Sequence, residues 1–286
     1  MRFASFQNNN GCGLAIDSGD GRFVGLVKGD AGYPGNIIDL LRGGDGALQK
    51  AGQQLAKGRY FDMSQVAPLP PISNPEKIIC IGLNYADHSA ESGFKVPDYP
   101  AIFDRFASSL VGHNAPLVRP KVSSQFDYEG ELVAVIGRGG RHIPKSSSLN
   151  HVAGYSIFND GSVRDYQFKS TQWSIGKNFD GTGAFGPTFV TADELPAGCK
   201  GLLLQTRLNG AIVQSASTSD MLFDVASLIA IISEAITLAP GDIIVTGTPS
   251  GVGLARKPPL FMKAGDVCEV EIEQLGILRN FVVDEN

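Results

Sequence analysis

The sequence holds few of the residues that build zinc sites or disulfide frameworks. It has four cysteines and four histidines among 286 residues. The cysteines are scattered, and no Cys-x-x-Cys motif occurs. We therefore expect reduced thiols, as in a cytoplasmic compartment, and no zinc site.

Basic runs and long apolar runs are also missing. The net charge is −5 and no segment is strongly basic, which argues against nucleic acid or an anionic membrane as a partner. The most apolar helical candidate, residues 228–239, is too short to span a bilayer and contains Glu234. The N-terminus lacks the continuous apolar core of a signal peptide. These absences predict a cytoplasmic protein.

The first 70 residues differ in pattern from the rest of the chain. Short strand-like runs (RFASF, GLAID, FVGLV) precede a helical piece, NIIDLLRG, which predicts a small α/β N-terminal domain over residues 1–70. Four prolines within residues 67–77 indicate a linker or a turn into the main body. The predicted main domain spans residues 71–286.

The sequence predicts that the main domain is mainly β with few helices, an α+β fold. Its short apolar runs alternate with Gly- and Pro-rich turns, and one long helical pattern covers residues 221–236. Asn209-Gly210, between two strand-like runs, predicts a β-hairpin. A composition of 43% hydrophobic and 19% charged residues is typical of a well-packed globular protein.

Three acids alternate at the start of the segment FDYEGELVAVIG, residues 126–137. A continuous strand would place Asp127, Glu129 and Glu131 on one face. The Cα atoms of Glu129 and Glu131 would lie roughly 6.6–6.8 Å apart, close enough for both carboxylates to reach one small cation. A solvated strand edge that uses acids against aggregation is the alternative. Asp160, at the end of the run GYSIF, is either a third ligand or a turn former.

Two further candidates are His88 and Lys177. His88 and Glu91 lie three residues apart, on one face of a helical turn. An acid beside an imidazole fixes its tautomer and suits it for proton transfer, although such a pair also occurs as a plain surface contact. Lys177, judged by itself, is a solvated cation.

Five motifs in one order resemble the fumarylacetoacetate hydrolase family. They are IGLNYADHSAE, DYEGELVAVIG, NDGSVRDYQ, WSIGKNFD and PGDIIVTGTPSGVG, and the similarity covers roughly residues 75 to 283. The chain resembles the short bacterial type, in which a small N-terminal domain precedes the shared core. The resemblance implies a mixed β-sandwich roll.

The resemblance also implies a divalent cation held by Glu129, Glu131 and Asp160. Ligands that are all carboxylate oxygens suit Mg²⁺ or Mn²⁺, with Ca²⁺ possible in crystals. His88 and Glu91 become the pair that activates water, on a segment that closes over substrate. Gly93 lies in that segment and suits a hinge.

The remaining site residues also follow from the resemblance. Lys177 is expected to stabilise negative charge that develops on the substrate. The expected substrate contacts come from two motifs and from one departure from the family pattern, where arginine replaces a common lysine and offers a bidentate carboxylate contact. These residues are Arg164, Gln167, Thr248 and Arg105.

The predicted activity is metal-dependent hydrolysis of a carbon–carbon bond in a 1,3-diketo acid such as an acylpyruvate. Decarboxylation of an oxaloacetate-type acid and isomerisation of a hydroxymuconate-type dienoate are alternatives at the same site. A metal-stabilised binding protein is the alternative without catalysis. The expected partners are a small keto acid and a second copy of the chain in a homodimer.

Overall fold

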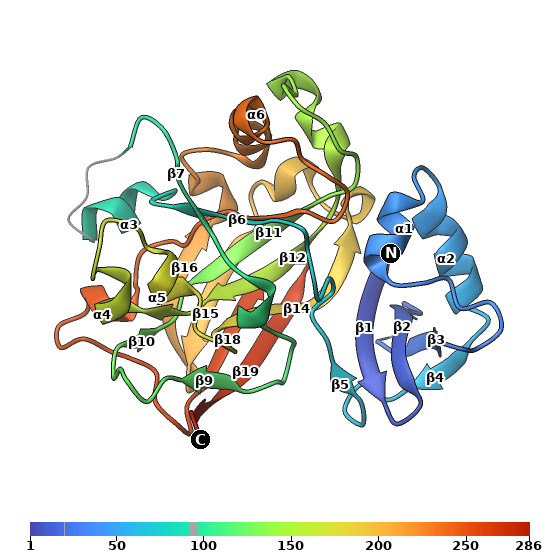
Figure 1. The fold of residues 1–286 in the computed structure, drawn as a ribbon, viewed down its shortest axis with the longest axis horizontal. Helices are drawn as coiled ribbons and strands as arrows, with labels where there is room; N and C mark the ends of the chain where they lie inside the picture. The colour runs from blue at the N-terminus through green and yellow to red at the C-terminus, as the bar shows by residue number, and fades with distance from the viewer. Residues whose placement is uncertain (20, 92–96) are drawn as a thin grey trace.

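The N-terminal segment forms an antiparallel sheet region covered by two helices. The computed structural model describes residues 1–19, 21–91 and 97–286. The short strand-like runs are confirmed as strands, and helix α1 begins at a capping box in which Asn36 and Asp39 bond each other's backbone N–H groups. The elements, blue in Figure 1, are β1 (Arg2–Asn8), β2 (Gly11–Asp17), β3 (Phe23–Val27), α1 (Ile37–Arg42), α2 (Ala47–Leu55) and β4 (Arg59–Phe61).

One large sheet joins this segment to the rest of the chain. Strand β1 pairs antiparallel with β14, so β4, β3, β2 and β1 continue the sheet of the main body. Across the sheet the next strands in order are β14 (Gly183–Thr191), β12 (Val152–Asp160), β11 (Gly130–Ile136), β17 (Ile243–Val245), β6 (Ile78–Gly82) and β7 (Ala101–Asp104). Two short strands pair off this path: β5 (Ala67–Pro68) with β1 and β8 (Leu110–Val111) with β14. The division into domains at residue 70 stays a prediction.

A second sheet of five strands packs against one face of the large one (Figure 1). The predicted hairpin at Asn209-Gly210 is confirmed: it joins β15 to β16, and both turn residues have positive φ. In spatial order the strands are β16 (Ala211–Ser217), β15 (Leu203–Leu208), β18 (Val267–Ile272), β19 (Gly276–Asp284) and β9 (Leu117–Arg119). Together the two sheets confirm the α+β fold with mixed sheets.

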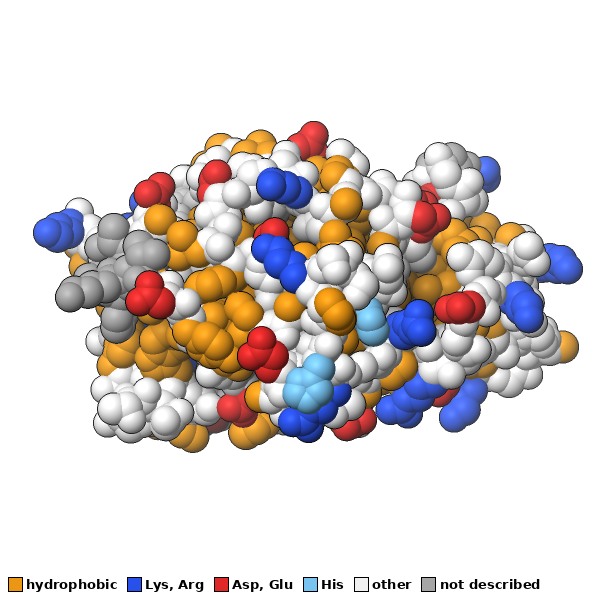
Figure 2. Space-filling model, turned by 90° about the horizontal axis from the view of Figure 1, so that it is seen from above, with side chains coloured by type: hydrophobic (Ala, Val, Ile, Leu, Met, Phe, Trp, Pro, Cys, Tyr) orange, Lys and Arg blue, Asp and Glu red, His pale blue; other side chains and the backbone are white. Residues whose placement is uncertain are grey.

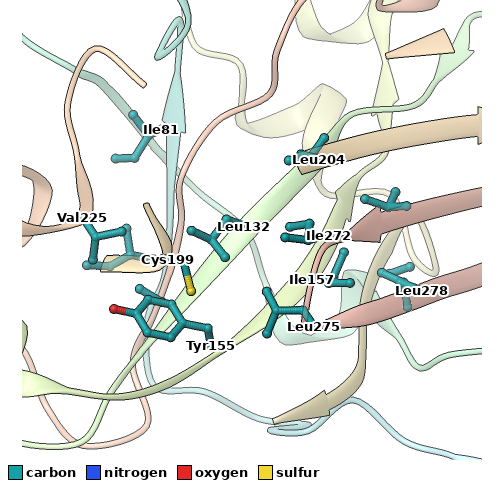
Figure 3. Packing of buried hydrophobic residues seen from close by; sticks show 14 of the residues in the cluster. Ile81, Leu132, Tyr155, Ile157, Cys199, Leu204, Val225, Ile272, Leu275 and Leu278 are labelled. Atoms are coloured by element: carbon teal, nitrogen blue, oxygen red, sulfur yellow. The ribbon is translucent and has the colours of Figure 1, made fainter. Parts of the chain in front are cut away.

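The uniformly apolar run of β11 is explained by burial on both faces. Leu132, Ala134 and Ile136 belong to the core between the two sheets. Val133 and Val135 point to the opposite face and belong to a second core, shared with the N-terminal segment. Figure 3 shows Leu132 of β11 and Ile157 of β12 in the first core with Leu204, Ile272 and Leu278 of the second sheet.

The helices of the main body are short, with one exception. Helix α6 (Val225–Ala235) begins four residues later than its predicted start at 221, because Asp224 accepts the N–H of Ser227 as the N-cap. The other helices are α3 (Ala86–Glu91), α4 (Arg164–Gln167), α5 (Ser174–Lys177) and the 3-10 turns Ala107–Ser109, Lys145–His151, Ala192–Glu194, Ala197–Cys199, Thr218–Asp220 and Gly253–Ala255. No helix in the described part of the chain is long and apolar enough to cross a bilayer. On the face drawn in Figure 2, acidic and basic side chains are interspersed.

Candidate metal and catalytic site

The candidate metal site lies where β11 begins and β12 ends. Glu131 opposes Phe158 in the antiparallel pair, and the backbone N–H of Asp160 donates to the carbonyl of Glu129 at 2.8 Å. The register therefore brings three carboxylates together, and they offer oxygens within 4.8 Å of one another. All three side chains are buried, so the solvated-edge alternative does not describe them. They are Glu129, Glu131 and Asp160.

The continuous strand predicted over 126–137 is wrong. Strand β10 (Phe126–Asp127) pairs with β13 (Ser162–Val163), and β11 starts only at Gly130. The break ends the simple alternation of side chains. Asp127 is fully buried, lies outside the cluster of ligand oxygens, and contacts Arg164 and backbone N–H groups instead.

Three buried cations surround the carboxylates. Lys177 Nζ lies 2.8 Å from Glu129 and 2.6 Å from Asp160. Arg164 Nη1 lies 2.6 Å from the other oxygen of Glu129. Burial lowers the pKa of Lys177, but the charges of Asp160 and Glu129 outweigh it and raise the pKa, so the ammonium stays protonated.

Arg105 lies behind Asp160 rather than in the cavity wall. Its guanidinium donates to Asp160 Oδ1 at 2.5 Å and to the hydroxyls of Thr182 and Ser109 at 2.9 and 3.2 Å. A Cβ at Gly183 would lie 2.7 Å from Arg105 Nη2, so glycine there makes room for the planar group. The arginine thus supports one candidate metal ligand, and its role as a substrate contact stays a prediction.

Glu129 and Glu131 differ in electrostatic surroundings although both are buried. Burial raises the pKa of Glu129, but Lys177 and Arg164 outweigh it and bring the pKa down to about 2. Burial, and then the charges of Asp160 and Glu129, raise the pKa of Glu131 well above its ordinary value. The backbone N–H of Gly247 donates to Glu131 at 2.5 Å. Glu131 is therefore the carboxylate that a bound dication would stabilise most.

The donor set fits a hard divalent cation. Three carboxylates supply oxygen ligands, the kind that Mg²⁺, Mn²⁺ and Ca²⁺ prefer, and the cluster offers no thiol or imidazole. Three protein ligands leave coordination positions for water and substrate. We take Glu129, Glu131 and Asp160 as the residues that would hold the ion.

Helix α3 places the His88–Glu91 pair across from the carboxylates. His88 Nδ1 lies 3.0 Å from Glu91 Oε1, and His88 is almost fully buried in the cavity wall. Both oxygens of Glu91 also accept the backbone N–H of Gly251, at 3.0 and 2.9 Å. Glu91 thus connects α3 to the loop after β17. Gly93, the suggested hinge, lies outside the described residues.

A small cavity joins these groups. It has a volume of about 50 Å³ and is lined by Glu129, Glu131, Lys177, His88, Arg164, Gln167 and Thr248. The other wall is apolar and includes Ile81, Phe103, Phe168, Trp173, Val252 and Leu254.

Arg164 keeps one donor unused in this cavity. Its Nε donates to Asp127 at 2.8 Å and its Nη1 donates to Gln167 at 2.9 Å. Nη2 is buried and has no hydrogen-bond partner among the described residues. An unpaired guanidinium nitrogen is costly unless a ligand satisfies it, and a carboxylate oxygen is the matching acceptor.

The sequence did not predict the contacts that two polar residues of the site make. For Asp127, the sequence suggested support of the metal ligands or a pairing with a nearby base, but it did not identify the partner. Gln214 was not noticed at all; its amide donates to the Thr248 hydroxyl at 2.8 Å, and its carbonyl accepts the N–H of Gly130 at 3.0 Å. Thr248 in turn donates to the carbonyl of Gly130 at 3.0 Å. No local sequence signal marks a glutamine 84 residues away from its partner.

Fold and site define a class: an α+β protein with a buried all-carboxylate metal site beside a small polar cavity. Residues 77–283 match the family model described as fumarylacetoacetate (FAA) hydrolase C-terminal. The chain belongs to the fumarylacetoacetate hydrolase family and is an enzyme of that family.

Relatives with different names share this architecture. The protein named "Oxaloacetate tautomerase fahd2, mitochondrial" from Xenopus laevis is 42% identical over 290 residues, which cover 99% of this chain and 90% of the relative. A solved fumarylacetoacetate hydrolase from Exiguobacterium antarcticum is 34% identical, with a TM-score of 0.86 and full coverage of both chains. A 5-carboxymethyl-2-hydroxymuconate delta-isomerase from Mycobacterium smegmatis is 31% identical, with a TM-score of 0.78 and the same coverage.

Proposed function

We propose that the protein is a divalent-metal-dependent enzyme that interconverts the keto and enol forms of a short 2-oxo diacid of the oxaloacetate type. The observation that carries this proposal is the meeting, in one cavity, of a metal-binding carboxylate cluster, a histidine paired with an acid, and an arginine with an unused donor. The oxaloacetate tautomerase, at 42% identity over nearly the whole chain, supports it. Hydrolysis of a diketo acid, expected from the sequence, becomes the second candidate.

The charge of the site favours an anionic substrate. Four buried carboxylates (Asp127, Glu129, Glu131 and Asp160) face three buried cations (Arg105, Arg164 and Lys177). This set has one net negative charge, so a bound dication makes it net positive. A 2-oxo acid, with a carboxylate and a keto oxygen side by side, suits such a centre.

His88 would transfer the proton. A bound Mg²⁺ or Mn²⁺ would supply Lewis-acid polarisation of the 2-oxo group. Because Glu91 occupies Nδ1, His88 Nε2 is left to take the C3 proton and return it to the keto oxygen. Lys177 stabilises the negative charge that develops on that oxygen, and Arg164 Nη2 binds a carboxylate of the substrate. As the proton moves from C3 to the keto oxygen, the C2=O double bond becomes single and a C2=C3 double bond forms; the only σ bonds made or broken are O–H and C–H, and no water is consumed.

A comparison of three substrates tests the proposal. Purified enzyme is mixed with enol-oxaloacetate, oxaloacetate and acetylpyruvate, each with Mg²⁺, with Mn²⁺ and with chelator. We expect metal-dependent loss of the enol absorbance that is faster than pyruvate release from either of the other acids. Faster hydrolysis of acetylpyruvate would establish the hydrolase instead, and faster decarboxylation of oxaloacetate the decarboxylase.

The same purified enzyme can be used to test two other candidate functions, an isomerase and a binding protein without catalysis. The delta-isomerase at 31% identity favours a test with a 2-hydroxymuconate-type dienoate, whose isomerisation also moves a proton within the substrate. A binding protein without catalysis would bind the metal and turn over none of these acids.

A further inference from the structure

We propose that Asp127 is a positioning residue, which orients Arg164 for anion binding and fixes the neighbouring loop of the cavity wall. This proposal rests on the proposed function only in taking an anionic acid as the ligand of the cavity. Asp127 is fully buried and does not line the cavity, so it acts through the groups that it contacts.

Four hydrogen-bond donors converge on the two oxygens of Asp127. Oδ1 accepts the backbone N–H groups of Gly253 at 2.8 Å and of Tyr128 at 2.9 Å. Oδ2 accepts Arg164 Nε at 2.8 Å and the N–H of Leu254 at 2.9 Å. A carboxylate is the side chain that accepts at both oxygens, whereas an asparagine would turn an NH₂ group toward donors.

The bond to Arg164 determines where its free donor points. Nε binds Asp127, while Nη1 lies 2.6 Å from Glu129 and donates to Gln167. Arg164 lines the cavity, and with these contacts fixed its planar guanidinium holds Nη2, which has no hydrogen-bond partner among the described residues, at one position. Burial lowers the pKa of Arg164, but Asp127 and Glu129 outweigh it and raise the pKa. The arginine therefore carries a permanent positive charge.

The bonds to Gly253 and Leu254 fix a neighbouring part of the cavity wall. Leu254 and Val252 line it, and both belong to the loop that Asp127 contacts. A Cβ at Gly253 would lie 2.6 Å from Asp127 Oδ1, so only glycine permits this approach. The same loop donates Gly247 N–H to Glu131 and Gly251 N–H to Glu91. One loop thus contacts a metal ligand, the acid of the histidine pair and Asp127.

Oxalate binding to the Mg²⁺-loaded protein, measured by calorimetry, tests the proposal. Oxalate is a dianion with two adjacent carboxylates and is not turned over. We expect Asp127→Asn to weaken oxalate binding about 10- to 100-fold, the effect of a misplaced charged hydrogen bond. Mg²⁺ affinity should stay within about threefold of wild type, because the three ligands are unchanged.

A double-mutant cycle separates positioning from a general structural effect. Arg164→Lys keeps the charge but removes the fork of donors. If Asp127 acts through Arg164, the double variant binds oxalate within about threefold of Arg164→Lys alone. Additive losses, or wild-type oxalate affinity in Asp127→Asn, would overturn the proposal.

Asp242→Asn is the matched control. Asp242 is another fully buried carboxylate that accepts a backbone N–H, from Ala239 at 2.7 Å, and contacts a cation, Lys77, at 3.2 Å. It lies outside the cavity lining. We expect this variant to keep the oxalate affinity of wild type.

A second variant covers the case in which Asp127→Asn does not fold. Asp127→Glu keeps both acceptor oxygens and the charge, but its extra methylene displaces them, so oxalate affinity should still fall. Wild-type affinity in Asp127→Glu would then overturn the proposal. Oxalate binding that follows this pattern without any turnover of oxaloacetate would refute the proposed function and leave the role of Asp127 intact.

Discussion

The cavity has two catalytic walls that are built in different ways. The strand wall comprises Glu129 and Glu131 with Asp160 behind them, fixed by the antiparallel register of β11 and β12. The helix wall is α3, a helix of six residues that carries His88 and Glu91. Glu91 connects this helix to the loop after β17 through the N–H of Gly251.

This difference separates binding from proton transfer. The strand wall lies between two apolar cores, so its carboxylates are held in place before any ligand arrives. In the proposed function, the helix wall supplies the group that moves a proton, His88. Substitutions in the strand wall should therefore affect the metal, and those in the helix wall should affect turnover at unchanged metal affinity.

The largest effect is expected for Glu131→Gln in the strand wall. It should abolish tight Mg²⁺ binding in calorimetry and lower turnover by several orders of magnitude, since both depend on the same carboxylate. In chelator the variant should be more stable than wild type, because it removes a buried charge whose pKa is raised.

The sign of this stability effect can be checked against pH. A carboxyl with a raised folded-state pKa binds its proton more tightly in the folded protein, so metal-free wild type loses stability as pH rises above the ordinary glutamate pKa of about 4.3. Glu131→Gln should lack this loss. Glu129→Gln is the matched control and should destabilise the protein, because Lys177 and Arg164 each lose one of their two carboxylate partners in a buried site. Equal stability changes in the two variants would contradict the difference in electrostatic surroundings between Glu129 and Glu131.

The next effect is expected for His88→Ala in the helix wall. Turnover should fall about 10²- to 10⁴-fold, the usual contribution of a general acid–base group, while Mg²⁺ affinity stays at the wild-type value. His142→Asn, at an exposed position with positive φ that asparagine tolerates, is the control. A loss of metal affinity in His88→Ala would show that the two walls are not separate.

A smaller effect is expected when the two contacts of Glu91 are separated. Glu91→Gln keeps an oxygen for the N–H of Gly251 but loses the charge beside His88. Glu91→Ala loses both. We expect turnover to fall about tenfold in the first variant and further in the second. Equal losses would mean that the contact with Gly251 contributes nothing.

The smallest effect concerns a histidine outside both walls. Burial, and then the charge of Arg279, lower the pKa of His113 to about 4. The unfolded chain binds this proton more readily, so stability is complete above about pH 6.5 and is lost as pH falls toward 4, by ~2 kcal/mol. Denaturant unfolding of wild type and His113→Gln at pH 7 and pH 4.5 measures the difference, and parallel losses would contradict it.

Local sequence patterns correctly predicted those strands and turns that depend on residues close together in the sequence. The Asn209-Gly210 hairpin and the strand that ends at Asp160 follow from turn chemistry and apolar runs, and the structure contains both. The start of α6 was wrong because the apolar pattern extends past the cap at Asp224. The strand through residues 126–137 was wrong because β10 pairs with β13 while β11 pairs with β12.

Contacts between segments that are far apart in the sequence could not be predicted from local patterns. Asp127 binds Gly253, 126 residues away, and Arg105 binds Asp160, 55 residues away. The resemblance to the family grouped Glu129, Glu131 and Asp160, and the structure brings these three carboxylates together, but it did not identify which residues Asp127 contacts. For Arg105 it suggested a substrate contact, which stays a prediction; the structure shows a contact with Asp160, a candidate metal ligand.

Water-proton relaxation of the Mn²⁺-loaded protein tests most directly whether Glu129, Glu131 and Asp160 bind a cation that stays open to the cavity. We predict one Mn²⁺ per chain with fast-exchanging water on it, and a fall in relaxation when oxalate is added. Absence of bound Mn²⁺, or a bound ion with no exchangeable water, would contradict this account.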